Sequence, residues 1–397
     1  MEWLKTKDAD KDGLTIPDTW LHIHYYEALS CLFRIENALR TFVFLVLKTE
    51  AGDSWPTFEI YSDDGNHTTI ASLAKKRIAQ NETFGYLGFT INSPLMHLTS
   101  GELVGLITSD SYWKYFSRYF RAVKRVVTLK LQEIGNIRNS LAHFRPITSD
   151  DVEVVKQNAN QVLSGVENAL IEATSCIDRV PTNTQETWYR EISTLGTQQC
   201  QFLLNQSQNK DWVRITLQFS CSASSYSGLT PSTLAVYEAL KLDSPECIKK
   251  FINIRQNLAI LTEEISFPGW EAKSEMSFRK DLQFTFAAKL LGQNHEKIKA
   301  DFEGLISQIA EEVELISEDH LARGELIRLV KVRAWEKKGA SGKSYWRFDM
   351  SPLLRPVQAN DPEEYWGNLE MSSKDLVTKI DKFPWMPVSI SKPPVPF

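Results

Sequence analysis

Arg138, Asn139 and His143 are residue types that together could cleave a phosphodiester. An arginine guanidinium presents a rigid fork of donors that matches two phosphate oxygens. A histidine, with an unperturbed pKa near 6.5, can accept or donate a proton near neutral pH. Asn139 could hold either group or a phosphate oxygen. Because the ribose 2′-hydroxyl can be the nucleophile, we expect RNA cleavage here without a metal. The alternative is a helix end that His143 caps or packs.

The sequence around these residues is strongly basic. Residues 114–145 contain eight Lys and Arg and one acid, Glu133, so this stretch has a net charge of +7 and the rest of the chain −12. Such a stretch could bind an RNA backbone by counterion release. The alternative is a solvated helix face with most of the neighbouring aromatic residues in the core. The basic candidates are Lys114, Arg118, Arg121, Lys124, Arg125 and Arg145.

Glu36 is a further candidate, in a helix expected over residues 20–47. A buried glutamate there could pair with Arg138 and fix its orientation. The alternative is a surface pair between Glu36 and Arg40, four residues apart, which contributes a few tenths of a kcal/mol.

Apolar spacing predicts the helices that must position this site. The three- and four-residue steps over 20–47, 68–80 and 112–134 indicate helices. The third would present Lys114, Arg118, Arg121 and Arg125 as one stripe and break near Gly135.

Two capping patterns complete the helical half. Thr99 to Glu102 forms a capping box before a short helix. Asp150 with Glu153 is expected to cap a helix that runs to about Cys176. Residues 15–180 therefore read as an all-α helical bundle.

Beyond the polar, Pro-containing stretch 181–185, the spacing of apolar residues changes from a helical to a strand-like period. Strict alternation over Trp212–Phe219 predicts a half-buried strand, and 326–350 reads as strand, turn, strand. We expect helices over 232–241, 245–264 and 295–316. Residues 186–383 are thus predicted to form an α+β domain, with a Pro-rich tail over 384–397.

The Arg138-Asn139-x-x-x-His143 pattern, inside a helical bundle, resembles the Arg-x4–6-His motif of the HEPN (higher eukaryotes and prokaryotes nucleotide-binding) superfamily. The polar residue after the arginine resembles the abortive-infection and toxin branch. The resemblance covers residues 15–180 and implies a metal-independent endoribonuclease, with His143 as general acid/base, Arg138 binding the scissile phosphate and Asn139 orienting. It also implies a homodimer in which two motifs face one another across a composite site.

Length and composition are compatible with this reading. The chain has 397 residues, 42 % of them hydrophobic, and a formal charge of −5. No apolar run reaches the ~20 residues of a membrane span, and the first residues do not resemble a signal peptide. Five scattered cysteines without a Cys-x-x-Cys pair indicate reduced thiols in the cytoplasm. No metal site and no cofactor are expected.

Two functions remain open at this point. The first is a bacterial antiphage, abortive-infection or toxin effector that cleaves RNA, restrained by an antitoxin, a sensor or a phage-derived trigger. The second is a non-catalytic HEPN adaptor that binds RNA or nucleotide. The α+β half would sense, regulate or select substrate.

Overall fold

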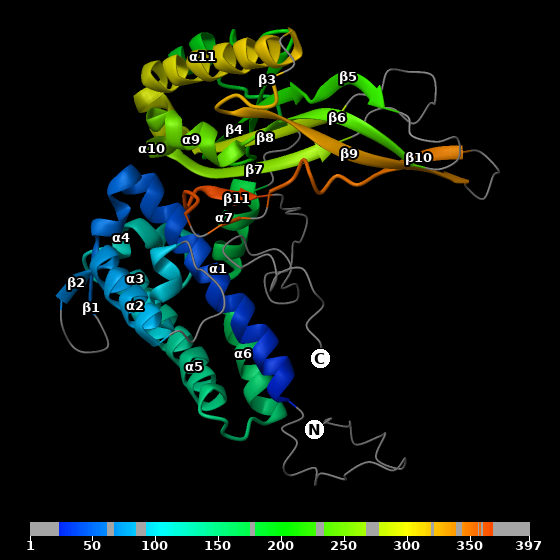
Figure 1. Ribbon diagram of the computed structural model, residues 1–397. Helices are drawn as coiled ribbons and strands as arrows, with labels where there is room; N and C mark the ends of the chain where they lie inside the picture. Colours follow the sequence, from blue (N-terminus) through cyan, green and yellow to red (C-terminus); the bar gives the residue numbers. More distant parts are fainter. Residues whose placement is uncertain are drawn as a thin grey trace, which may run out of the picture.

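The computed structural model describes residues 24–61, 67–84, 93–174, 179–227, 234–266, 278–318, 321–338, 344–355, 357–358 and 360–367. Helices occupy the N-terminal half, and mixed sheets follow (Figure 1). The first half contains α1 (Tyr25–Ala51), η2 (Gly52–Thr57), β1 (Glu59–Tyr61), β2 (His67–Thr69), α2 (Ile70–Phe84), η3 (Pro94–His97), α3 (Ser100–Thr108), α4 (Trp113–Phe116), η4 (Ser117–Tyr119), α5 (Lys124–Ala142), α6 (Ser149–Val162) and α7 (Ser164–Thr174).

Helix α1 is the central element of the helical half. Its residues from Ala38 to Leu47 are all buried, because α3, α5, α6 and α7 pack against it. Phe42 is fully buried and contacts the rings of Phe116, Tyr119 and Phe120. The aromatic residues at the start of the basic stretch thus pack against α1.

The prediction of one continuous helix over 112–134 is wrong. The chain forms α4 and η4, becomes extended at Phe120, and begins α5 only at Lys124. The ring of Phe120 stacks on Trp113 and also contacts Phe42. This aromatic packing accompanies the turn in the chain, so the four predicted basic residues do not form one helical stripe.

The predicted break near Gly135 is also wrong. Helix α5 continues through Gly135 to Ala142, so Arg138 lies inside it. A glycine in a helix costs only about 1 kcal/mol relative to alanine. The buried contacts of Val127, Leu131 and Ile134 are sufficient to offset that cost.

The capping predictions had mixed outcomes. The Thr99–Glu102 box is confirmed, since the Thr99 hydroxyl accepts from Glu102 N–H and the Glu102 carboxylate accepts from Thr99 N–H. The next cap is at Thr148 with Asp151 rather than at Asp150. The helix that follows is divided at Leu163 into α6 and α7.

The second half combines two sheets with helices. The elements are α8 (Thr187–Ile192), β3 (Cys200–Gln206), β4 (Trp212–Ser220), β5 (Ser222–Ser227), β6 (Leu234–Leu242), α9 (Ser244–Lys250), α10 (Ile252–Asn257), β7 (Leu258–Ser266), β8 (Arg279–Ala287), α11 (Ala288–Glu318), β9 (Ile327–Lys338), β10 (Ser344–Phe348) and β11 (Tyr365–Gly367). The sheet orders are β11-β7-β8-β4-β3 and β10-β9-β6-β5, and β11–β7 is the one parallel pair among the described strands.

Long helix α11 lies across the five-stranded sheet. Its Phe302 packs edge-on against Phe202 of β3 and Phe284 of β8. The strand predicted over 212–219 is confirmed as β4, but it is covered on both faces: Arg214 and Thr216 are buried as well as the apolar positions.

Two predicted helices are wrong. Residues 232–241 fall largely in strand β6, and 245–264 contains only the short helices α9 and α10 before β7. The predicted strand pair over 326–350 is confirmed as the antiparallel β9 and β10. The Pro-rich tail over 384–397 lies outside the described residues.

Hydrophobic contacts cross the expected boundary at 181–185. Trp212, Ile260 and Trp366 of the second half belong to the same buried cluster as α1. Lys48 at the far end of α1 is fully buried and pairs with Glu364 at 2.7 Å. The two halves therefore share part of one core.

Candidate functional site

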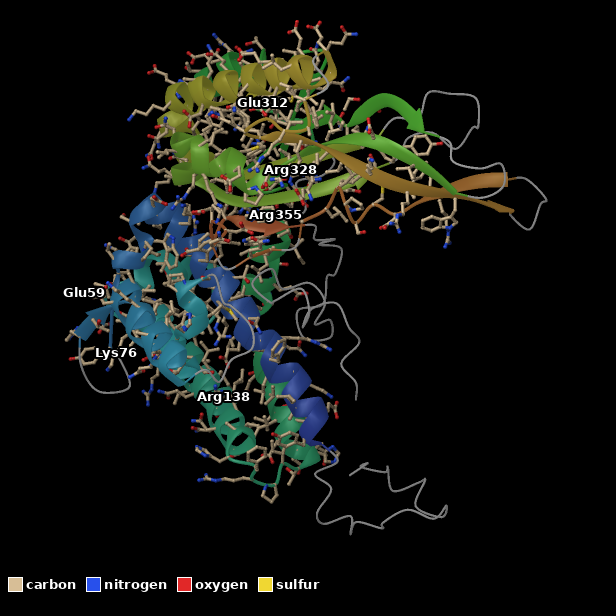
Figure 2. All side chains as sticks on the ribbon, in the orientation of Figure 1. Glu59, Lys76, Arg138, Glu312, Arg328 and Arg355 are labelled. Carbon is tan, nitrogen blue, oxygen red and sulfur yellow. The ribbon has the colours of Figure 1, made fainter. Side chains whose placement is uncertain are left out.

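Arg138 lies on α5 (Figure 2), and its guanidinium pairs with Glu36 of α1. Its Nε lies 3.5 Å from Glu36 Oε2, and its side chain remains 38 % exposed. That distance fits an ion pair but exceeds a good hydrogen bond. In the described part of the chain, no residue accepts a hydrogen bond from the two Nη groups of Arg138, so these donors can bind a ligand.

Glu36 also pairs with Arg40, one turn later on α1. Arg40 is buried, and its Nε and Nη2 donate to the carbonyls of Leu95 and Leu98. Burial lowers the pKa of the Arg40 guanidinium; the Glu36 carboxylate opposes the shift and Arg138 adds to it. Glu36 thus pairs with both Arg138 and Arg40, the two partners considered from the sequence.

Ser100, at the start of α3, is a site residue that sequence reasoning missed. Its hydroxyl donates to Glu36 Oε2 at 2.5 Å. The capping pattern correctly located the start of α3, yet nothing in it indicated that Ser100 would face α1. Glu102 fixes this helix end further, because its carboxylate accepts two hydrogen bonds from Arg77, at 2.7 and 2.8 Å.

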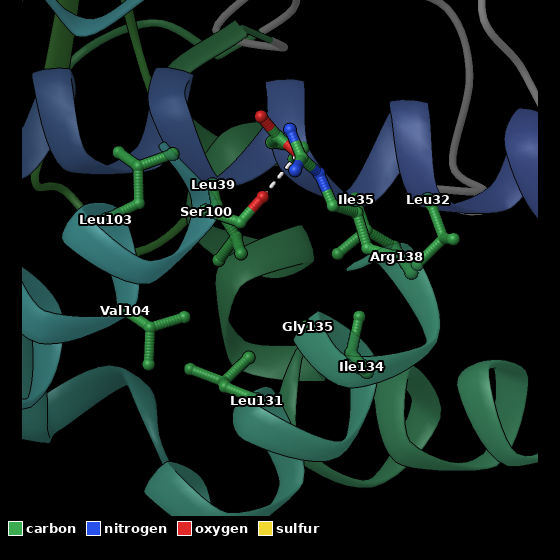
Figure 3. Close-up of a pocket in the computed structure, with 11 residues that line it drawn as sticks. Leu32, Ile35, Leu39, Ser100, Leu103, Val104, Leu131, Ile134, Gly135 and Arg138 are labelled. Carbon is green, nitrogen blue, oxygen red and sulfur yellow. Dashed lines mark hydrogen bonds and ion pairs between the residues drawn. The ribbon is translucent and has the colours of Figure 1, made fainter. Parts of the chain in front are cut away.

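A small pocket of about 30 Å³ lies between α1, α3 and α5 at this place (Figure 3). Glu36, Ser100 and Arg138 form its polar side. The remaining lining is almost entirely apolar: Leu32, Ile35, Leu39, Leu103, Val104, Leu131, Ile134 and Gly135. The apolar walls keep the Glu36–Arg138 pair away from bulk water on one side, which strengthens their attraction.

His143 and Asn139 lie at the exposed end of α5. They are one helical turn apart and therefore share a face, and both are exposed. Arg138 lies five residues before His143, which places it on a different side of the helix. Among the described residues no hydrogen bond or ion pair joins Arg138 to either of them, so one chain does not bring the three predicted residues to a common point.

The end of α5 has a specific backbone geometry. The Phe144 N–H donates to Leu141 O and the Arg145 N–H to Ser140 O, which together form a Schellman motif. The motif needs a left-handed residue, and Phe144 occupies it with φ 55°. Glycine is usual there because a Cβ costs about 1–2 kcal/mol in this conformation. The Phe144 ring is 77 % exposed and stacks at 6.3 Å on Tyr25.

The six basic candidates differ in their surroundings. Lys124 pairs with Asp110, Lys114 lies over the Tyr115 ring, and Arg118 stacks on Tyr119 and bonds to its hydroxyl. The other three, Arg121, Arg125 and Arg145, are exposed and have no ion pair within the described residues. These three are the candidates best placed to meet a phosphate backbone.

The described residues contain no group of three or more His, Cys, Asp or Glu side chains arranged to hold a metal ion. No described helix has the length and apolar character needed to cross a membrane. Comparisons with protein-family models, with curated proteins and with solved structures find no match to this chain.

Proposed function

We propose that this protein is a metal-independent endoribonuclease of the HEPN type, acting as an effector in bacterial antiphage defence or as a toxin. One observation carries the proposal: an arginine anchored by a carboxylate, with open Nη donors, lies on the same helix end as exposed Asn139 and His143. A guanidinium and an imidazole are the groups that a 2′-hydroxyl attack on phosphate requires.

The reaction proceeds by internal transfer. His143 takes the proton of the 2′-hydroxyl, whose oxygen attacks the adjacent phosphorus. The bond to the 5′-oxygen breaks, and that oxygen receives a proton from a second imidazole. Arg138 neutralises the charge that builds on the non-bridging oxygens. The products are a 2′,3′-cyclic phosphate and a 5′-hydroxyl.

A homodimer supplies the second imidazole. A single chain offers one imidazole at this helix end, that of His143, and its Arg138 lies on a different side of α5. Two α5 ends that face one another would bring two His143 and two Arg138 side chains to one phosphate.

The separation of Arg138 from His143 is also the observation that favours the alternative function. If the chains do not pair in this way, the exposed cations of α5 would bind RNA or nucleotide without cleavage, and the protein would act as an adaptor. The two functions differ in turnover, which can be measured.

The test is cleavage of a mixed-sequence RNA by the full chain in the presence of EDTA, with analysis of the product ends. We expect cyclic phosphate ends, and a loss of about 10²- to 10⁴-fold in rate for His143→Ala and for Arg138→Ala. Lys297→Ala, an exposed site on α11, is the control and should cleave as the wild type does. Undiminished cleavage by either site variant would contradict the assignment, and binding without turnover by the wild type would favour the adaptor.

A further inference from the structure

The β9–β10 hairpin is a second basic segment, far in sequence from α5. Residues 327–348 contain seven Lys and Arg and a single acid, Glu336, a net charge of +6 in 22 residues. Together with the basic stretch at 114–145, this leaves −18 on the rest of the chain. An acidic protein with two segments of net positive charge presents two separate sites of attraction for a polyanion.

The hairpin lies at the edge of the four-stranded sheet, which extends away from the helices (Figure 1). Near its start, Ile327 is buried and belongs to the core that contacts α11. Farther along, the strand alternates: Val332 and Ala334 are buried, whereas Lys331 and Arg333 are exposed. The outer end of the sheet thus has one covered face and one open face.

The open face combines cations with an aromatic ring. Partly exposed Trp335 follows Lys331 and Arg333 on that face and pairs in register with exposed Arg347 of β10. No described residue forms an ion pair with Lys331, Arg333 or Arg347. Two acids are near: Glu238 lies opposite Lys331 in the ladder, and Asp349 follows β10, with Arg333 contributing to the lowering of its pKa.

We infer that this open face, defined by Lys331, Arg333, Trp335 and Arg347, binds single-stranded RNA; the inference rests on the proposed function, since it supplies that enzyme with a second contact to its substrate. Same-face residues in a strand are about 7 Å apart, so the cations form a row that an extended phosphate backbone can follow. A sheet face with a partly exposed ring is a surface on which unpaired bases can stack.

Two other polyanions fit the face less well. The bases of a duplex are already stacked and cannot use Trp335, so a duplex would gain only the charge contacts. A membrane surface would favour large apolar side chains for insertion, and in the described part of the hairpin none of the strongly exposed side chains is apolar.

The test is fluorescence anisotropy of the full chain with a 5′-labelled 20-nucleotide single-stranded RNA whose 2′-hydroxyls are methylated, so that it cannot be cleaved by 2′-attack. The variant Lys331→Gln/Arg333→Gln/Arg347→Gln removes three charges from the face. We expect its Kd to rise at least ten-fold at 0.1 M salt, and the slope of log K against log salt to fall by about 2, since each phosphate contact on a single strand contributes about 0.7.

A matched control removes the same charge elsewhere. Lys297→Gln/Lys299→Gln/Arg323→Gln changes exposed or partly exposed cations of α11 and the loop after it, and its Kd should stay within two-fold of the wild type. Trp335→Leu should weaken binding about five-fold or more while Trp335→Phe restores it, because stacking needs a ring.

An unchanged Kd and salt slope in the hairpin variant would overturn the inference, as would tighter binding to phosphatidylserine vesicles or to a 20-base-pair duplex than to the single strand. The proposed function is tested separately. If the wild type shows no His143-dependent cleavage of unmodified RNA but the hairpin variant still loses affinity, the RNA-binding face is supported and the nuclease activity is contradicted.

Discussion

Glu36 determines how Arg138 can act. A guanidinium alone on a helix surface samples many rotamers, and fixing it during reaction costs entropy. Glu36 restrains one edge of Arg138, and the pairing leaves the Nη groups open. Arg40 donates to two backbone carbonyls and pairs with Glu36. Glu36 is therefore itself held in place by a buried side chain that is bonded to the backbone. The three charges therefore act as a positioning unit, with Arg138 as its exposed member.

Ser100→Ala tests that unit at a residue that acts on Arg138 through Glu36. The change removes the hydrogen bond to Glu36 Oε2 and should lower the free energy of unfolding by about 1 kcal/mol. We expect kcat for RNA cleavage to fall three- to ten-fold with KM nearly constant, since a looser Arg138 stabilises the transition state less well. Ser100→Thr keeps the hydroxyl and should restore kcat. Equal kcat in the Ala and Thr variants would show that Ser100 does not position the site.

Helix α5 shows how much of the site the sequence could predict. Its apolar spacing correctly predicted the buried face that contains Val127, Leu131 and Ile134. The spacing could not predict the turn at Phe120, because that turn depends on ring contacts with Phe42, which is distant in sequence. Nor could it predict that packing would carry the helix through Gly135. The same limit applies to β6, where pairing with β9 decides a segment whose local sequence also fits a helix.

Phe144, next to His143, has a strained left-handed backbone. Two substitutions distinguish the effect of this strain from the effect of the aromatic ring. Phe144→Gly and Phe144→Ala both remove the aromatic contact with Tyr25, but only glycine relieves the left-handed backbone. We expect the Gly variant to be about 1 kcal/mol more stable than the Ala variant in chemical denaturation. Both should cleave RNA less well if the exposed ring contacts a base. Equal stability of the two variants would show that the helix end relaxes without cost.

The whole molecule links the site to the sheets through α1. This helix has 27 residues and is therefore about 40 Å long. Glu36 lies near its middle, and Lys48, twelve residues later, pairs with Glu364 of the second half. One end of α1 reaches the sheets (Figure 1). The sequence indicated a helical half and a mixed half, but it contained no sign that Trp366 would enter the core around α1. Such a contact joins residues more than 300 positions apart, and local periodicity carries no information about it.

A double-mutant cycle on Lys48 and Glu364 measures how firmly the halves are joined. Both side chains are buried, with their charged atoms 2.7 Å apart, and Asp53 also contacts Lys48 at 3.1 Å. Lys48→Met leaves the buried charge of Glu364 with only Arg255, whose Nε lies 3.9 Å from Glu364 Oε2, so the cost in chemical denaturation should be near the low end for a broken buried pair, about 3 kcal/mol. Adding Glu364→Gln removes that charge, so the double variant should recover most of the loss. If the double variant were no more stable than Lys48→Met, the junction would depend on the lysine stem and the apolar contacts of Trp366 rather than on the charge pair. In either case the loss should appear in one cooperative transition, because the shared core prevents the helical half from unfolding without exposing the sheet that covers it.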